Sequence, residues 1–151
     1  MVTEIIEGVY YHSLPIIQTT GGSVMHAIKG FDEHFTQFGE CYFSTAQSKS
    51  PKAWKKHSKM ICNLFVPQGD VRFIFYDDRE GSKDFKKVTE FTMGTQNYGR
   101  LIINPGVWFG FSGISESADS LILNVANIKH DPTESIRLEP DTSDIPYTWQ
   151  F

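Results

Sequence analysis

The chain has 151 residues, a formal net charge of −4 and two cysteines, Cys41 and Cys62, in no metal-like spacing. This length suits one domain of roughly 100–150 residues, and the negative charge argues against general nucleic-acid binding. The acidic first residues do not resemble a signal peptide, no apolar run reaches roughly 18 residues, and the cysteines indicate buried thiols in a reducing compartment. We therefore expect a soluble cytoplasmic protein without a membrane span.

Short apolar segments separated by turn residues follow one another along the second half of the chain. The candidate strands are residues 63–66, 71–76, 88–93, 101–103 and 120–126. The turn signal at residues 67–70 predicts a hairpin between the first two segments. In the second segment Val71, Phe73 and Phe75 share one face, and the opposite face is also largely apolar. A strand between two packed layers is expected to have this pattern.

The composition favours a fold made almost entirely of strands. Twelve glycines and seven prolines are scattered through a chain with 14% aromatic residues, which is typical of many short strands joined by turns. No segment shows sustained helical periodicity, and only residues 32–38 could hold a helical turn or two. We predict an all-β sandwich or barrel with few short helices, formed by residues 1–151 as a single domain.

The segment from Trp54 to Asn63 carries polar residues at strand spacing. Read as a strand that begins at His57, it places His57, Lys59 and Asn63 on one face. That choice is unusual for a core and suitable for a pocket, although a surface strand whose polar face meets water would have the same pattern. Five lysines lie within eleven residues here: Lys49, Lys52, Lys55, Lys56 and Lys59. They could hold a diphosphate, or form a solvated loop that protects a sheet edge.

A second segment, Ile103-Asn-Pro-Gly-Val-Trp-Phe-Gly-Phe111, combines a tight turn with bulky neighbours. Asn104-Pro-Gly106 supplies the turn, and the small Gly110 allows close packing. Taken alone, this segment indicates a turn that packs into the core.

The two segments together resemble the dTDP-4-dehydrorhamnose 3,5-epimerases, sugar-nucleotide epimerases of the cupin superfamily. In that family the second segment reads close to IPEGFAHGF, and the His57 segment falls at its R-G-L-H. Residues 124–137 are similar to the family's strand, its D-Y-Y-x-P turn and its G-I-R, and residues 140–149 are similar to its closing D-P-x-x-x-I-x-W. The resemblance covers roughly residues 38–150 and little of the first 37. It implies a cupin jelly-roll barrel and a homodimer.

The resemblance also implies roles for single residues. His57 corresponds to the catalytic base, and Asp141, or else Asp144, would orient it and stabilise its imidazolium form. A 4-keto sugar loses a proton next to the ketone to such a base, and reprotonation from the other face inverts the centre. Lys59 or Asn63 would stabilise the enolate oxygen.

Three positions depart from the family's pattern. Trp54 stands where the family has a phosphate-binding Arg, Phe109 where it has the His of H-G-F, and Asn124 where it has the catalytic Tyr, the acid opposite the base. Substitute acids are Tyr42, Tyr76, Tyr98 or a water. The residues expected to contact the substrate are Trp54, Asn63, Glu40 (near the family's substrate-contacting Gln), Lys56, Asn124, Phe109 and Tyr42.

The metal-binding cupins are a less suitable match. They need a His-x-His pair, a nearby Glu and a second His after the Pro-x-Gly turn, because these ligands converge on one ion. Here the pair reads His57-Ser-Lys59 and the second His is replaced by Phe109. We expect neither a metal nor another cofactor.

The sequence therefore predicts a metal-independent epimerase that acts at C3 and/or C5 of a nucleotide-linked 4-keto-6-deoxy sugar in surface-polysaccharide biosynthesis. A keto-sugar 3,4-isomerase and a non-catalytic sugar- or nucleotide-binding cupin are the alternatives. The residue that discriminates between them is His57, since an enzyme needs it and a binding protein should tolerate its loss.

Overall fold

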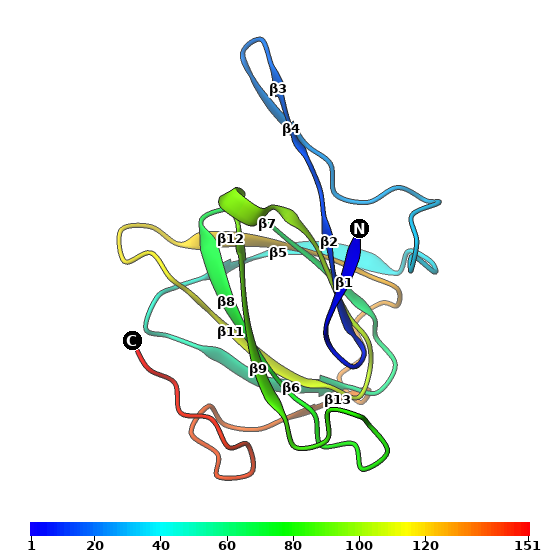
Figure 1. Cartoon of the computed structure of the whole chain (residues 1–151), viewed down its shortest axis with the longest axis vertical. Coiled ribbons are helices and arrows are strands. Elements are labelled where there is room, and N and C mark those ends of the chain that lie inside the picture. The colour runs from blue at the N-terminus through cyan, green and yellow to red at the C-terminus, as the bar shows by residue number, and fades with distance from the viewer.

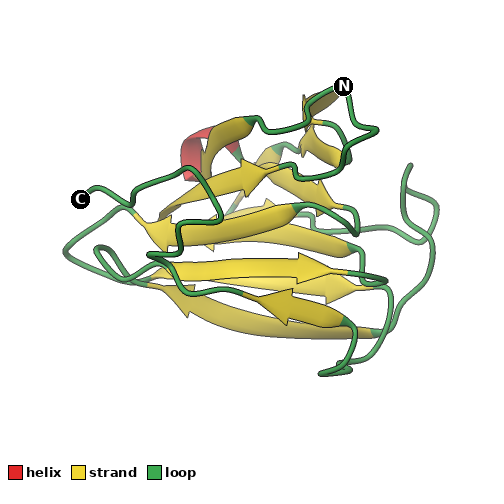
Figure 2. Cartoon of the chain, turned by 90° about the horizontal axis from the view of Figure 1, so that it is seen from below, coloured by secondary structure: helices red, strands yellow, loops and turns green.

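Two antiparallel sheets packed face to face form the body of the protein (Figures 1 and 2). The computed structural model describes all 151 residues. The larger sheet contains, in spatial order, β1 (Val2–Ile6), β2 (Val9–Ser13), β10 (Gly99–Ile103), β7 (Cys62–Gln68), β12 (Ser120–Ala126) and β5 (Glu40–Ala46). The smaller sheet contains β13 (Ser135–Arg137), β6 (Lys52–His57), β11 (Trp108–Gly113), β8 (Asp70–Tyr76) and β9 (Val88–Gly94). This is the predicted jelly-roll sandwich.

The main core lies between the two sheets and consists of 17 buried residues. Leu64 and Val66 of β7 reach it from the larger sheet, and Val71, Phe73 and Phe75 of β8 reach it from the smaller one. The other face of β8 is buried as well, because the C-terminal segment covers it; Ile74 packs there in a second apolar cluster. The prediction that residues 71–76 form a strand between two packed layers is therefore confirmed, because both faces of β8 are buried in apolar clusters.

The predicted hairpin between residues 63–66 and 71–76 is wrong. β7 pairs with β10 and β12, whereas β8 pairs with β11 and β9. Gly69, with a φ of +78°, lies in the turn that carries the chain from one sheet to the other. Both segments are apolar enough to be central strands, so local sequence does not reveal that they belong to opposite layers.

The predicted strand that begins at His57 and continues to Asn63 is also wrong. β6 ends at His57 in the smaller sheet, residues 58–61 form a loop, and β7 begins at Cys62 in the larger sheet. His57 and Asn63 therefore lie in different layers and do not share a face.

Helical structure is limited to one 3₁₀ turn, η1 (Thr95–Asn97), and residues 32–38 contain turns only. No helix is long and apolar enough to cross a membrane. A two-stranded ribbon of β3 (Ile16–Thr19) and β4 (Gly22–Met25) projects from the body (Figure 1). The C-terminal segment after β13 lies along the side of the smaller sheet.

We predict that Phe73→Ala lowers the free energy of unfolding by about 3–5 kcal/mol. Phe73 is fully buried and its ring lies 5.7 Å from that of Phe111. Urea-induced unfolding measures the change. Phe31→Ala is the matched control because Phe31 is 86% exposed, and it should change stability by less than about 0.5 kcal/mol. Equal effects of the two substitutions would contradict this assignment of the core.

Candidate active site

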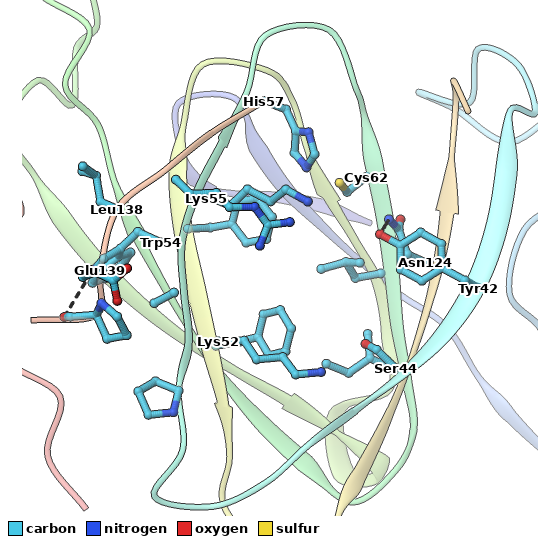
Figure 3. Close-up of a pocket in the computed structure, with 18 of the residues that line it drawn as sticks. Tyr42, Ser44, Lys52, Trp54, Lys55, His57, Cys62, Asn124, Leu138 and Glu139 are labelled. Atoms are coloured by element: carbon cyan, nitrogen blue, oxygen red, sulfur yellow. Dashed lines mark hydrogen bonds between the residues drawn. The ribbon is translucent and has the colours of Figure 1, made fainter. Parts of the chain in front are cut away.

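A cavity of about 760 Å³ opens between the two sheets, within the usual range for ligand pockets. Side chains of β6 and β11 from the smaller sheet and of β5, β7 and β12 from the larger sheet line it (Figure 3). The segment that follows β13 forms part of its rim, at Leu138, Glu139 and Pro140.

A bulge in β6 determines which of its side chains enter the cavity. Lys55 pairs with Phe109 of β11, but Lys52 pairs with Phe111, so three steps along β6 match two along β11. A bulge of this kind shifts the alternation of side chains along a strand. As a result Lys52, Lys55 and His57 all line the cavity (Figure 3). Gly110 makes room for this arrangement, because a Cβ there would lie 2.5 Å from the Cβ of Ala53.

The imidazole of His57 is held by a buried carboxylate. His57 Nδ1 is hydrogen-bonded to Glu134 Oε1, and the two side chains are only 5% and 3% exposed. Oε2 of Glu134 accepts hydrogen bonds from the backbone amides of Ser58, Lys59 and Met60 at 3.1–3.2 Å. Strand β13 brings Glu134 here because Ser135 pairs with His57 in the register of β13 and β6.

These contacts determine the protonation of the pair. Burial opposes ionisation of Glu134, but the hydrogen bonds from His57 and from the loop amides outweigh it and hold the pKa of this carboxyl below its ordinary value. Burial lowers the pKa of His57, although Glu134 partly offsets the effect. The favoured state is an ionised Glu134 that accepts a hydrogen bond from the Nδ1–H group of a neutral His57. Nε2 is then a free acceptor, as a general base requires.

A phenol stands on the opposite wall. Tyr42 of β5 pairs with Asn124 of β12, and Nδ2 of Asn124 donates a hydrogen bond of 3.0 Å to the hydroxyl oxygen of Tyr42. Burial raises the pKa of Tyr42, so the phenol keeps its proton at neutral pH. Because Asn124 occupies an acceptor site on the oxygen, that proton is free for another acceptor. Figure 3 shows His57 and Tyr42 on the two sides of the cavity.

Three cations line the cavity without an acidic partner. Lys55, Lys52 and Arg137 take part in none of the salt bridges of the structure. Lys55 and Arg137 are paired across β6 and β13. Burial lowers the pKa of Lys55, and the charge of Arg137 lowers it further. Neighbouring unpaired cations of this kind suit an anionic ligand.

Two apolar groups complete the wall near the base. The ring of Phe109 stacks on His57 with centroids 6.0 Å apart. Burial raises the pKa of Cys62 to about 12, so this thiol stays neutral and does not compete as a base. No three His, Cys, Asp or Glu side chains are grouped so that they could hold a metal ion.

The structure brings five of the predicted site residues to the cavity lining: His57, Tyr42, Asn124, Phe109 and Trp54. Tyr76 and Tyr98, the other candidate acids, do not line it. Trp54 contributes to the lining, but its ring points to the other side of β6 and packs in the second apolar cluster (Figure 3). The ring therefore belongs to the core.

Six of the residues predicted for the site lie elsewhere. Asp141 lines a neighbouring groove and does not touch His57, whose partner is Glu134. Asp144 does not line the cavity either. The predicted contacts of Lys59 and Asn63 with the enolate are also wrong, because neither residue lines the cavity. The backbone amide of Lys59 donates to Glu134, and the side chain of Asn63 donates to the backbone oxygen of Val125. Lys56 points away from the cavity and pairs with Asp78 at 2.7 Å, and Glu40, at the start of β5, is not in the lining.

The sequence analysis did not predict Glu134 as a site residue. It also gave Arg137, Lys52 and Lys55 no individual place in the site. Glu134 and Arg137 lie inside the 124–137 match to the family, so the signal was present. Nothing in the linear order shows that Glu134 reaches back across 77 residues to His57. The bulge that turns Lys52 and Lys55 inward is likewise a tertiary feature.

No model of a known protein family matches the chain. A solved dTDP sugar isomerase from Desulfovibrio desulfuricans G20 is 35% identical, with a TM-score of 0.91 over 99% of this chain and 94% of that one. A probable low-salt glycan biosynthesis epimerase of Haloferax volcanii, Agl13, is 30% identical over 118 residues, which cover 78% of this chain and 72% of the relative. The chain belongs to the family of sugar-nucleotide epimerases and isomerases.

The fold agrees with this membership. A solved dTDP-4-dehydrorhamnose 3,5-epimerase from Sulfolobus tokodaii superposes with a TM-score of 0.83 over 100% of this chain and 86% of that chain, at 16% identity. The predicted fold class is confirmed, and the 35% and 30% identical relatives confirm the predicted family and its epimerase or isomerase class of enzyme. The expected homodimer and the expected cytoplasmic location stay predictions.

We predict that acidification destabilises the protein from about pH 6.5 downward. The pKa of His57 is lowered from its ordinary value of 6.5, so the folded state binds this proton less readily than the unfolded state. The stabilisation is complete above 6.5 and is lost as the pH falls through the folded pKa. Glu134, whose pKa is lowered from 4.5, adds a further loss at lower pH.

Urea unfolding between pH 8 and pH 5 measures this dependence. His57→Asn should reduce the slope below pH 6.5, while burial of His12, which lowers its pKa as well, leaves a residual slope. His26→Asn, at an exposed position, is the control and should leave the slope unchanged. A wild-type stability that does not change between pH 7 and pH 5.5 would show that His57 is not held as described.

Proposed function

We propose that this protein epimerises a carbon next to the ketone of a nucleotide-linked 4-keto-6-deoxy sugar, at C3 and/or C5. The observation that carries the proposal is the pair of proton-transfer groups on opposite walls of one cavity, His57 and Tyr42 (Figure 3). The similarity to a dTDP sugar isomerase and to a glycan biosynthesis epimerase supports the substrate class and a role in polysaccharide synthesis.

The first step is removal of a proton by His57. Glu134 fixes the tautomer with the proton on Nδ1, so Nε2 accepts the proton from the carbon beside the ketone. The imidazolium that forms is stabilised by the ionised carboxylate, which the loop amides hold in place. The electrons left on the sugar move to the ketone oxygen and give an enolate.

The second step is reprotonation from the other wall. Tyr42 presents a protonated hydroxyl across the cavity, and delivery of its proton to the opposite face of the enolate inverts the centre. The sequence match places the family's acid at Asn124, and Tyr42 is the register partner of Asn124 on the next strand. A hydroxyl is thus supplied from beside the expected position. This opposed pair favours epimerisation over an isomerisation in which one base moves a proton along a single face.

The cations divide between the enolate and the diphosphate. Lys55 is the next inward side chain after His57 on β6 and reaches the ketone oxygen, where a positive charge stabilises the developing enolate. Arg137, which lies beside Lys55 on β13, and Lys52, which lies further along β6, hold the diphosphate. Guanidinium and ammonium groups bind phosphate oxygens through charge-assisted hydrogen bonds.

The decisive experiment follows solvent deuterium in the sugar. We would incubate the protein with dTDP-, GDP-, UDP- and CDP-linked 4-keto-6-deoxy sugars in deuterated water and record NMR spectra. Wild-type protein should exchange the proton next to the ketone and form the epimer. His57→Asn should slow both by about 10²–10⁴-fold. Tyr42→Phe should keep the exchange, because His57 can return a deuteron to the same face, but should lose the epimer.

Tyr10→Phe, on a half-buried tyrosine outside the cavity, is the matched control and should behave as wild type. A Tyr42→Phe variant that still forms the epimer would remove Tyr42 from the acid role. A protein that binds one of these compounds and exchanges no proton would be a binding protein, and the proposal would be wrong.

The two cation roles give different kinetic effects. Lys55→Met should lower kcat by about 10²–10³-fold, because it removes a charge that acts in the transition state. Arg137→Met should raise KM by about 10- to 100-fold with a smaller change in kcat, because the diphosphate is bound alike in ground and transition states. Steady-state kinetics separates the two. Equal effects on KM from both variants would place Lys55 on the diphosphate instead.

A further inference from the structure

Asn127 makes contacts that the proposed reaction steps do not use. It directly follows β12, and its side-chain oxygen Oδ1 accepts the backbone N–H of Ile61 at 2.7 Å. The backbone N–H of Asn127 donates to the carbonyl oxygen of Ile61 at 3.3 Å. Asn127 therefore engages both backbone polar groups of Ile61, which is the last residue of the loop between β6 and β7.

The side chain of Asn127 takes the place of a backbone acceptor. β12 and β7 are antiparallel, and Ala126 pairs with Cys62 where their ladder ends. In a regular hydrogen-bonded pair, two opposite residues exchange both backbone bonds. Here the backbone oxygen of Asn127 instead accepts Nε2 of Gln37 at 3.0 Å. The attachment of the loop to β12 therefore depends on a side-chain oxygen, which a substitution can remove.

The loop that Asn127 holds carries the hydrogen-bond donors of Glu134. The backbone amides of Ser58, Lys59 and Met60 donate to Oε2 of Glu134 at 3.1–3.2 Å. Successive N–H groups that converge on one point form an anion-binding concavity. The strength of these bonds depends on how well the loop holds the direction of its amides.

The two ends of the loop are anchored by different contacts. At the first end, the N–H of Gly106 donates to the carbonyl oxygen of His57 at 2.8 Å. At the other end, Ile61 is held by Asn127, and the side chain of Met60 is buried in the main core. Because Ile61 directly follows Met60, the bond to Asn127 fixes the peptide group next to the third donor.

The geometry points to Asn127 as a positioning residue for the proton transfer at His57. Its side-chain oxygen holds the loop whose amides balance the charge of Glu134, and Glu134 orients the imidazole. The same strand carries Asn124, which donates to the hydroxyl of Tyr42, so the end of β12 is connected to both walls of the cavity. This inference rests on the proposed function and deepens it, because it names a residue that acts on the base without touching the substrate.

Loss of this bond has a defined effect on the protonation of the pair. The loop amides stabilise the pair in its anionic form, with Glu134 ionised and His57 neutral. When these bonds weaken, the two coupled groups take up their shared proton at a higher pH. None of the other ionisable groups on the surrounding elements hydrogen-bonds to Asn127. These groups are Lys55, Lys59, Cys62, His130, Asp131 and Arg137.

The test removes the side-chain oxygen of Asn127 and follows the protonation of His57. Asn127→Leu has nearly the same shape without an acceptor, and Asn127→Ala removes the same oxygen with less bulk. Circular dichroism would confirm that each variant is folded. NMR of ¹⁵N-labelled histidine would record the titration without any substrate, and His57→Asn would identify the signal.

Asn97→Leu is the matched control. The side chain of Asn97 also bonds to the backbone, because it accepts from the N–H of Gly94 and donates to the carbonyl oxygen of Thr92. It lies outside the cavity and contacts neither His57 nor Glu134. Its substitution therefore removes comparable hydrogen bonds at a site that cannot act on the base.

Both Asn127 variants should move the titration of His57 upward by about one pH unit, a tenfold gain in proton affinity, while Asn97→Leu should match wild type. Solvent-deuterium exchange into the sugar at pH 8 should slow by about 10-fold in the Asn127 variants, because the imidazole is held less well. Asn127→Asp keeps an acceptor oxygen for Ile61 and should restore most of the exchange.

A His57 titration that is the same in wild type and in the Asn127 variants would overturn the inference. An equal shift in Asn97→Leu would overturn it as well, since a general loss of stability would then explain the result. A further measurement uses wild-type protein alone. If its Ile61 amide exchanges with water as fast as an unstructured amide, the bond to Asn127 is not maintained and the inference fails.

These outcomes are separable from those of the proposed function, because the titration needs no sugar. A shifted titration together with an absence of proton exchange in every protein tested would keep the positioning role and reject the epimerase. Proton exchange in wild type with an unchanged titration in the Asn127 variants would reject the positioning role and keep the epimerase.

Discussion

The candidate active site depends on one buried carboxylate. Glu134 is almost fully enclosed and is balanced by His57 and by three backbone amides of the loop between β6 and β7. A buried charge is costly unless its hydrogen-bonding capacity is used, so the loop, the turn before β13 and the His57 ring must be placed together. The same interaction gives the His57 imidazole its tautomer, its orientation and its counter-charge.

The two-layer sandwich places His57 and Tyr42 on opposite walls of one cavity. His57 belongs to the smaller sheet, while Tyr42 and Asn124 belong to the larger one. Sheets packed over a dense core keep a fixed separation, so His57 and the phenol of Tyr42 face each other across the cavity without the help of a mobile loop. The proposed inversion needs this geometry, because the two proton transfers occur on opposite faces of the sugar.

Several groups expected from the resemblance are replaced by neighbours and not simply lost. Asn124 stands where the family has its acid, and it donates to the hydroxyl of Tyr42 on the adjacent strand. Trp54 stands where the family has a cation, and its ring packs in the second apolar cluster. Lys55 and Arg137 bring positive charge into the cavity. Phe109, in place of a His, packs on the His57 ring. The cavity therefore contains a hydroxyl and positive charges that come from positions next to those the resemblance implied.

The sequence alone predicted the all-β class, the alternation in β8 and the family, because short-range periodicity and ordered motifs report these directly. The family resemblance also pointed to His57, Phe109, Tyr42 and Asn124, which line the cavity. Only the tertiary structure decided that β7 and β8 lie in opposite sheets, that Glu134 and not Asp141 holds His57, and that Lys59 and Asn63 are outside the cavity. The physical reason is that these features depend on which strands pair. A bulge, a change of layer and a contact between residues 77 positions apart are all of this kind. Strand pairing is set by the packing of the whole sandwich and not by the residues that are neighbours in sequence.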